Sequence, residues 1–491
     1  MVSTMRPALP IVTAVIVSIG GAGLGCRRPN GAETRTVAQA DVAAYRDAAA
    51  RIADATRGGA QAYHRVADLA DLIGPRMVGS PALVRAVTWA HDAFAADKQQ
   101  NVSLDPVRLP VWARGNESAE IVGESPRRLA VLGLGGTVGT PPGGLTAEVA
   151  VVSSLDELAK LGASVRGRIV LLNCPFPPGN PALAYAHTIG CRVDGPTRAA
   201  ALGAVAALVR SLASASLGAP HTGWTHDGPG SKIPAAALSV EDAQLVARLA
   251  ARGQPVSVHL ELQDGPRPDA TSFNVLAELR GRDQPEELVV IGAHLDSWDV
   301  GEGAQDDGAG VAIVMESLAT LRRLHLIPRR TIRAVLYTSE EEEARGGQAY
   351  GQAHDKELAH VVAAFETDVG AGAPLGFRMD GVPAAVVDAR GLAALLAPIG
   401  ATAVDAGFAG ADISHIRQPG KPGPPMLGLF SDPTHYFDVH HSVADTLEKI
   451  DPVALGQNVA AMATMAYVVA DRETRWPSSP PPPPPGGGTK P

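Results

Sequence analysis

The sequence has little cysteine, few aromatic residues and no clustered positive charge. Only 3 of its 491 residues are cysteines, and aromatic side chains make up 4% of the chain. The net charge is −9, and no run of basic residues is present. Because surfaces that bind nucleic acid carry a basic patch, this composition argues against nucleic acid as a partner. Cys174 and Cys191 are the only cysteines besides Cys26; they are able to pair in an exported protein, but their spacing alone does not show that they do.

Apolar residues are plentiful. They make up 45% of the sequence, and the length is sufficient for more than one hydrophobic core. The 53 glycines and 40 prolines indicate many turns, but with this apolar content they do not indicate disorder.

The N-terminus has the pattern of an export signal. Arg6 is followed by a long apolar stretch from Ala8 to Leu24, typical of a secretory signal over residues 1–25 rather than of a membrane-spanning helix. Leu24-Gly25-Cys26 resembles a bacterial lipoprotein cleavage box, although such boxes usually have leucine where Gly23 stands. Two interpretations stay open: Cys26 is acylated, or the signal is a plain secretory one. The protein is then a periplasmic or outer-membrane lipoprotein or a secreted protein, and residues 26–36 are expected to form a flexible tether.

The stretch Leu288–Gly310, LVVIGAHLDSWDVGEGAQDDGAG, carries the strongest chemical signal. Its apolar start predicts a strand buried on both faces, and the helical period after Asp306 predicts a helix. His294 and Asp296 are two residues apart, so in an extended chain they share a face. A carboxylate that holds one imidazole nitrogen leaves the other nitrogen free to bind a metal ion. The alternative is a core histidine near solvated loop acids.

Two further apolar runs also end in acidic residues. Residues 331–337 precede the acids Glu340–Glu343, and residues 361–365 precede Glu366–Asp368. If the three strands are neighbours in one parallel sheet, these acids and His294 lie at one edge, where α/β proteins bind ligands. A histidine-rich segment follows at His435–Thr446.

Together these segments resemble the co-catalytic di-zinc exopeptidases, a family that includes secreted bacterial aminopeptidases and glutamate carboxypeptidases. Within that family the resemblance is strongest to the plasma glutamate carboxypeptidase (carboxypeptidase Q) branch. It covers nearly all of residues 60–471, and its motifs are LADLIGPRMVGS (69–80), LPVWARGNESAE (109–120), GAHLDSWDVGEGAQDDGAG (292–310), TSEEE (338–342), ETD (366–368) and HHSVADT (440–446).

The resemblance implies an α/β fold: a three-layer αβα mixed sheet of the zinc exopeptidase type with an inserted protease-associated α/β domain. Residues 37–136 would form the N-terminal part of the catalytic domain and residues 266–472 its metal-binding part. Between them, residues 137–265 alternate short strands with alanine-rich helices, which fits the insert. His221, Trp224 and His226 lie there in a stretch expected to be a surface loop. The Pro/Gly-rich tail, residues 477–491, is expected to be extended and unpacked.

The resemblance also assigns roles to residues. It implies two zinc ions, with cobalt or manganese as alternatives, because the ligands are imidazoles and carboxylates. Asp306 would bridge the ions, Asp296 would orient His294, and Glu340 would be the general base. His441 is preferred as a ligand to His440, which stays open as the alternative. The full set of metal ligands is His294, Asp306, Glu341, Asp368 and His441.

The function that follows is an exported di-zinc exopeptidase acting on short peptides with a free terminus, as an aminopeptidase, dipeptidase or carboxypeptidase. Alternatives are an amidase or deacylase on the same metal site and a receptor-like binding protein without activity. Relatives of this branch commonly form homodimers, and contact with a membrane is expected only through a lipid anchor.

Overall fold

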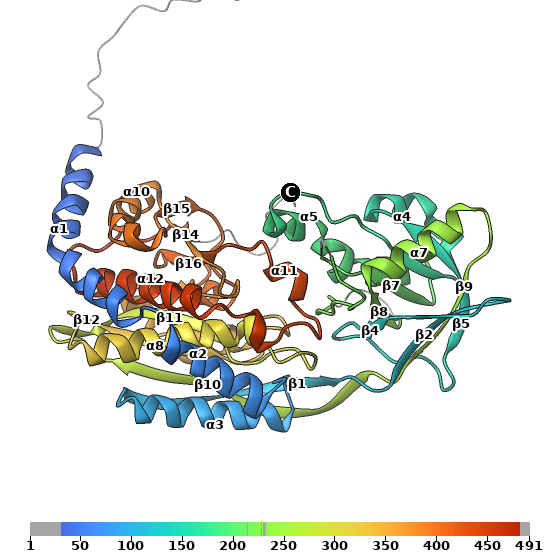
Figure 1. Ribbon diagram of the computed structural model, residues 1–491, viewed down its shortest axis with the longest axis horizontal. Helices are drawn as coiled ribbons and strands as arrows, with labels where there is room; N and C mark the ends of the chain where they lie inside the picture. Colours follow the sequence, from blue (N-terminus) through green and yellow to red (C-terminus); the bar gives the residue numbers. More distant parts are fainter. Residues whose placement is uncertain (1–30, 214, 227, 229–231, 482–491) are drawn as a thin grey trace, which may run out of the picture.

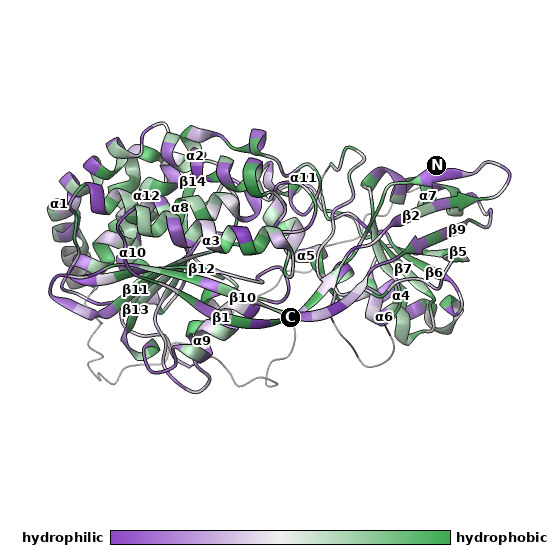
Figure 2. Ribbon diagram, turned by 90° about the horizontal axis from the view of Figure 1, so that it is seen from below, coloured by the Kyte–Doolittle hydropathy of each residue, from purple (hydrophilic) through white to green (hydrophobic). Residues whose placement is uncertain are grey.

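The computed structural model describes residues 31–213, 215–226, 228 and 232–481. The expected signal peptide, Cys26 and the last ten residues of the tail lie outside these ranges. Figures 1 and 2 show two units side by side, joined by the long strands β1 (Gln100–Ala113) and β10 (Gly265–Leu279). These two strands pair antiparallel, so the second unit is inserted between them in the chain.

The first unit is built on a mixed eight-stranded sheet in the order β1-β10-β12-β11-β13-β16-β14-β15. Its remaining strands are β11 (Gln284–His294), β12 (Arg330–Tyr337), β13 (Val361–Glu366), β14 (Pro374–Asp380), β15 (Ala403–Ala406) and β16 (Met426–Ser431). The pairs β11–β12, β11–β13 and β13–β16 are parallel. The three strands predicted from apolar runs are therefore neighbours in one sheet, as expected.

Helices cover both faces of this sheet because its central strands are apolar on both sides. Val289 and Ile291 of β11 pack into the large core shared with the helices α8 (Ala309–Arg323) and α12 (Pro452–Asp471). Leu288 and Val290 face the opposite side, where they join a cluster with residues of α9 (Arg345–Ala353) and η6 (Ile413–Ile416). This alternation produces three layers. By length and composition α12 is apolar enough to cross a membrane, but its apolar stretch is 89% buried inside the first unit.

The N-terminal helices complete the first unit, and one prediction there is wrong. Helix α1 (Gly31–Ala55) begins inside the expected tether, so residues 31–36 are helical. The helices α2 (Ala60–Ala67) and η1 (Asp68–Ile73) precede α3 (Pro81–Ala96), whose N-cap is Ser80: its side chain accepts a hydrogen bond from the N–H of Leu83. Ser80 as the N-cap and Pro81 at the first helical position are residue types that favour a helix start.

The second unit has its own eight-stranded sheet in the order β3-β2-β9-β5-β6-β7-β8-β4. Its strands are β2 (Glu117–Val122), β3 (Arg127–Leu129), β4 (Val131–Gly133), β5 (Leu145–Val152), β6 (Ile169–Leu172), β7 (Ala206–Arg210), β8 (Ala235–Leu238) and β9 (Ser257–Leu262). Its helices are α4 (Leu155–Leu161), η2 (Gly162–Val165), α5 (Pro181–Val193), α6 (Gly195–Ala201) and α7 (Val240–Ala251). Residues 117–136 thus belong to this unit and not, as predicted, to the first. A disulfide joins Cys174 to Cys191 on α5.

The first unit also contains several short helices and a packed C-terminal segment. The short helices are η3 (Ala304–Gly308), η4 (Leu358–His360), α10 (Pro383–Leu392), η5 (Ala393–Ile399), α11 (Tyr436–Val439) and η7 (Leu447–Lys449). Beyond α12, Ser479 is buried, forms a β-bridge with Gly423 and accepts a hydrogen bond of 2.9 Å from Arg417. The expectation of an unpacked tail is therefore wrong for this part of it.

Candidate metal centre

The predicted ligands meet at the carboxyl ends of the parallel strands. His294 is the last residue of β11, the pair Glu340–Glu341 follows β12, and Asp368 follows β13. Asp306 lies in η3 before α8, and His441 follows α11. Residues from five segments are thereby brought together, as the sequence predicted.

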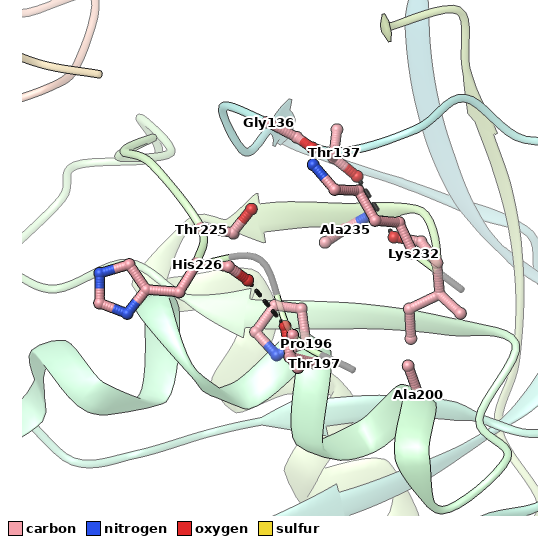
Figure 3. A pocket seen from close by; sticks show the side chains of 11 residues that line it. Gly136, Thr137, Pro196, Thr197, Ala200, Thr225, His226, Lys232 and Ala235 are labelled. Carbon is pink, nitrogen blue, oxygen red and sulfur yellow. Dashed lines mark hydrogen bonds between the residues drawn. The ribbon is translucent and has the colours of Figure 1, made fainter. Parts of the chain in front are cut away.

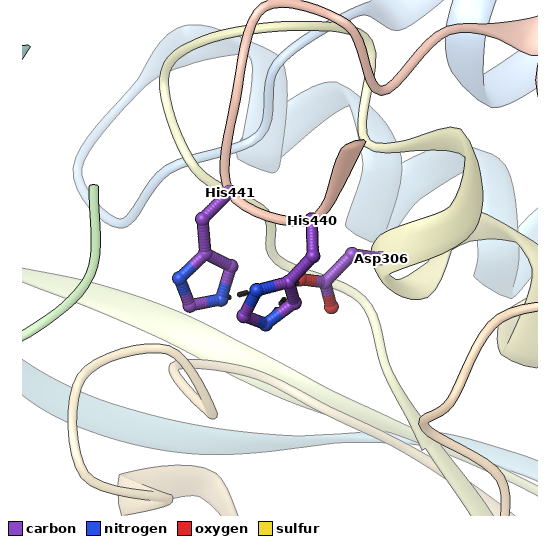
Figure 4. A group of neighbouring side chains, drawn as sticks. All are labelled: Asp306, His440 and His441. Atoms are coloured by element: carbon purple, nitrogen blue, oxygen red, sulfur yellow. Dashed lines mark ion pairs between the residues drawn. The ribbon is translucent and has the colours of Figure 1, made fainter. Parts of the chain in front are cut away.

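Asp306 lies between two histidines and presents a different oxygen to each of them. Its Oδ1 is 3.2 Å from Nε2 of His294, and its Oδ2 is 3.2 Å from Nε2 of His441. Figure 4 shows Asp306 facing His440 and His441, which come from the segment after α11. One carboxylate placed in this way is able to bind two cations, one through each oxygen.

Each side of Asp306 carries a further carboxylate. On the first side, Oδ1 of Asp368 is 3.3 Å from Nε2 of His294. On the second side, Oε2 of Glu341 is 3.0 Å from Nε2 of His441. His294, Asp306 and Asp368 form one group of candidate donor atoms, and Asp306 belongs to a second group with His440 and His441.

Asp296 fixes the ligands in a different way from the one predicted. The nearest partner of His294 Nδ1 is the backbone carbonyl of Asp296 at 3.0 Å, whereas the Asp296 carboxylate is 3.8 Å away. That carboxylate instead accepts hydrogen bonds from the backbone N–H groups of Glu340 (3.1 Å) and Glu341 (3.3 Å). The two glutamates lie in a turn that follows β12. Asp296 therefore holds this turn as well as the histidine.

His441 contacts more of the site than His440. The His440 Nε2 atom is 3.6 Å from Asp306, and its ring stacks on His441 with 3.5 Å between centroids. Burial and the neighbouring His441 hold the pKa of His440 well below its usual range. For His441 burial opposes the charged form, but Glu341 and Asp306 outweigh it and raise its pKa to about 9.

Comparison with known proteins places this arrangement in a family. The sequence profile of peptidase family M28 matches residues 274–466. The chain is 40% identical to carboxypeptidase Q of Xenopus laevis over 441 residues, which are 89% of this chain and 92% of that protein. It is 41% identical to carboxypeptidase Q of Bos taurus over 456 residues, 92% of this chain and 95% of that one. The chain belongs to peptidase family M28.

Solved M28 structures agree with the fold. The peptidase M28 precursor from Shewanella amazonensis SB2B superposes with a TM-score of 0.85 at 36% identity, covering 89% of this chain and 99% of that one. A zinc aminopeptidase from Bacillus subtilis shares the fold with a TM-score of 0.62 at 20% identity, covering 85% of this chain and 96% of that one. The M28 assignment confirms the resemblance seen in the sequence, and the chain is a metallopeptidase of this family.

The charge of the M28 site fits bound cations. Glu340 and Asp368 lie half-buried in the cleft, and the partial burial of Glu340, followed by repulsion from Asp368, raises the pKa of Glu340 well above its usual range. Burial also raises the pKa of Glu341, although His441 opposes this shift. Oε1 of Glu341 is a buried oxygen without a hydrogen-bond partner among the described residues. A surplus of buried carboxylate oxygens next to two imidazole nitrogens is a donor set that suits zinc.

Several residues that support the M28 ligands were not assigned roles from the sequence. The N–H of Trp298 donates to Glu341 at 2.6 Å, and Asp307 accepts from the backbone N–H of His294 at 3.1 Å. Asp445 accepts from the backbone N–H groups of Gln305 (2.7 Å) and Asp306 (3.2 Å). Trp298, Asp307 and Asp445 each lie inside one of the family motifs, close in sequence to a proposed ligand, and this closeness was the only sequence signal of a supporting role. The hydrogen bonds themselves form only in the folded chain.

The second unit supplies one wall of the cleft above the metal centre. The cleft has a volume of about 410 Å³, and residues of the second unit line it together with Glu340, Asp368 and His441. Tyr185 and Arg192 come from α5, and Trp224 comes from the segment between β7 and β8. His221 is buried as well, which corrects the expectation of a surface loop for that stretch.

A second cavity, of about 30 Å³, lies wholly in the second unit (Figure 3). Its lining includes Thr137, Thr197 and Lys232, and Lys232 donates to the carbonyl of Gly136 at 3.0 Å. None of the candidate metal ligands lines this cavity, which is about the size of a single water molecule.

Proposed function

We propose that this chain is an exported exopeptidase that uses two zinc ions to hydrolyse short peptides with a free terminus. The observation that carries the proposal is Asp306, whose two oxygens each lie 3.2 Å from a different histidine. A single carboxylate shared by two imidazole–carboxylate groups is the arrangement that two ions require.

The ligands divide into two sets that share Asp306. One ion would be held by His294, Asp306 and Asp368, and the other by Asp306, Glu341 and His441. Cobalt or manganese would suit the same donors. When bound, such ions lower the pKa of water and polarise a carbonyl group.

Glu340 is suited to move the proton in this reaction. It lines the cleft beside Asp368, and its backbone N–H is fixed by Asp296 at 3.1 Å. Burial favours its protonated form, while positive charge in the site would favour the carboxylate. Glu340 would accept a proton from the attacking water and pass it to the leaving amine, as a general base and then a general acid.

The second unit restricts the substrate to short peptides. We propose that it is a protease-associated insert, since its residues line the cleft together with the candidate ligands. Tyr185 stacks on Phe437 of α11 with 4.8 Å between ring centroids, so the two units contact each other beside the metal centre. A cleft of about 410 Å³ has the size of a small-ligand site.

Export is proposed from the signal-like residues 1–25, either with an acylated Cys26 or with a plain secretory signal. Carboxypeptidase Q is the name of the relatives at about 40% identity. Experiment distinguishes an aminopeptidase from a dipeptidase or a carboxypeptidase. The mass of the protein in solution tests whether it forms a homodimer.

The test is hydrolysis of a dipeptide panel with free, N-blocked or C-blocked termini, before chelation, after chelation and after zinc return. We expect cleavage of free dipeptides that is lost on chelation and restored by zinc. Blocking the essential terminus should abolish cleavage and so identify the form. Cleavage of N-acyl amino acids alone would instead establish the deacylase, and a zinc-free protein without hydrolysis would establish the receptor-like alternative.

A further inference from the structure

We infer that the second unit positions the metal ligand His441 through the peptide group of Thr222, with Arg192 as a positioning residue. This inference rests on the proposed metal centre. It assigns to the second unit a role in building the centre, in addition to covering it.

Thr222 contacts His441 through both of its backbone polar groups. Its N–H donates to the carbonyl of His441 at 2.9 Å, and its carbonyl oxygen is 3.2 Å from Nδ1 of the His441 ring. Thr222 belongs to the second unit and His441 to the first. One residue of one unit therefore fixes both the backbone and the ring of a ligand in the other.

The contact also selects which ring nitrogen is free. A carbonyl oxygen only accepts hydrogen bonds, so Thr222 holds a proton on Nδ1 of His441, and Nε2 is the nitrogen whose lone pair would be available to a bound cation. Nε2 is the nitrogen that faces Asp306 and Glu341. His294 has the same arrangement within the first unit, since its Nδ1 lies 3.0 Å from the carbonyl of Asp296.

Arg192 holds the Thr222 carbonyl in place. Its Nη1 donates to that oxygen at 3.2 Å, and its Nη2 donates to the hydroxyl of Tyr185 at 2.8 Å. Nη1 of Arg192 is also 3.4 Å from Nδ1 of His441. If Nη1 donated to Nδ1, the imidazole proton would be on Nε2, and Nε2 could not bind a metal ion. The two contacts with the Thr222 carbonyl are shorter, at 3.2 Å each, so this oxygen accepts from both Nη1 of Arg192 and Nδ1 of His441. Among the described residues no carboxylate lies within ion-pair distance of Arg192, so its guanidinium donates to neutral acceptors, the Thr222 carbonyl and the Tyr185 hydroxyl.

Thr222 itself is fixed to the sheet of the second unit. Its side chain is fully buried, and its hydroxyl donates to the carbonyl of Gly133 on β4 at 2.7 Å. The position of His441 is thereby tied to that sheet. If the two units separated, His441 would lose this support, so zinc binding and contact between the units should be coupled.

Gly223→Ala tests the inference because its methyl group would force the Arg192 guanidinium and the Thr222–Gly223 peptide group apart. A Cβ at Gly223 would lie 2.3 Å from Cζ and Nη1 of Arg192. Gly123→Ala is the matched control: its φ of 145° is close to the 142° of Gly223, it lies in the same unit, and its Cβ would meet nothing within 4 Å. The two variants share the backbone strain, and only the first disturbs Thr222 and Arg192.

The measurement is the affinity of the metal-free protein for zinc, determined by competition with a chelator. We expect Gly223→Ala to weaken binding of one of the two ions by about 10–100-fold, the typical effect of losing a group that orients a ligand. Gly123→Ala should stay within about twofold of the wild type. Unchanged affinity in a folded Gly223→Ala protein would overturn the inference. A wild type that binds no zinc would overturn the metal centre itself, which is a distinguishable failure.

A second measurement decides the matter if Gly223→Ala does not fold. In zinc-loaded wild type labelled with ¹⁵N-histidine, the resonances lost in His441→Gln identify the ring. We expect a proton on Nδ1 and zinc on Nε2. The reverse assignment would overturn the role of Thr222.

Discussion

The indole N–H of Trp298 donates a 2.6 Å hydrogen bond to Oε2 of Glu341. Trp298 is itself buried in a small cluster with Met77 and Trp112, so the direction of this bond is fixed by packing. Oε2 of Glu341, which also lies 3.0 Å from Nε2 of His441, is thereby fixed, while Oε1 is buried and has no hydrogen-bond partner among the described residues.

Trp298→Phe should therefore weaken zinc binding without unfolding the protein. The ring is retained and only the donor is lost, so we expect about a tenfold fall in zinc affinity, at the lower end of the range for such supporting groups. Trp112→Phe is the control, since Trp112 packs in the same cluster but donates to the carbonyl of Thr137 at 2.9 Å. Equal effects of the two substitutions on zinc affinity would contradict the role of Trp298.

Glu340→Gln should remove hydrolysis and retain the metal. The amide cannot accept the proton, so kcat is expected to fall by about 10²–10⁴-fold, the usual contribution of a general base. Zinc content, measured by mass spectrometry, should equal that of the wild type. Glu342→Gln is the neighbouring control: burial raises the pKa of Glu342 to about 8, but it is not among the cleft-lining residues. If Glu340→Gln kept kcat within about threefold, another residue would be the base.

The pair formed by His354 and Asp105 predicts a pH dependence of stability far from the metal. Nε2 of His354 lies 2.6 Å from Oδ2 of Asp105, and this hydrogen bond raises the pKa of His354 although burial opposes the shift. Because the folded pKa is higher than the unfolded one, the stabilisation is complete below about pH 6.5 and is lost as pH rises through the folded pKa.

Asp105→Asn should accordingly lower the melting temperature most at low pH. The pair is partly exposed to solvent, so its contribution is about 0.2–1 kcal/mol. In melting curves from pH 6 to pH 9 the difference between wild type and variant should shrink toward zero as pH rises. If the difference in melting temperature between wild type and variant grew with pH, the expected direction of the pH dependence would be wrong.

The metal-binding edge of the sheet could be predicted because local patterns determine it. The apolar runs before His294, Glu340 and Glu366 become β11, β12 and β13, which are parallel neighbours. Once such strands are parallel, the residues that follow them meet at one edge. The motifs of the M28 family then assigned individual ligands within that edge.

The parts that could not be predicted depend on contacts between distant segments. The turn at Glu340–Glu341 is held by Asp296, and the ring of His441 by Thr222 of the second unit. No periodicity in the sequence records either contact. The second unit begins at Glu117 because β2 pairs with β9, a partner about 140 residues away along the chain. Pairing over such separations is not visible in local composition.

Asp306 is the residue on which both halves of the metal centre depend, and Asp306→Ala tests the account most directly. The measurement is the number of zinc ions bound per chain after metal-free protein is loaded with zinc and dialysed, with wild type measured in parallel. We expect two ions in the wild type and at most one in the variant, which should also lose dipeptide hydrolysis. Two retained zinc ions with undiminished hydrolysis in Asp306→Ala would contradict the account.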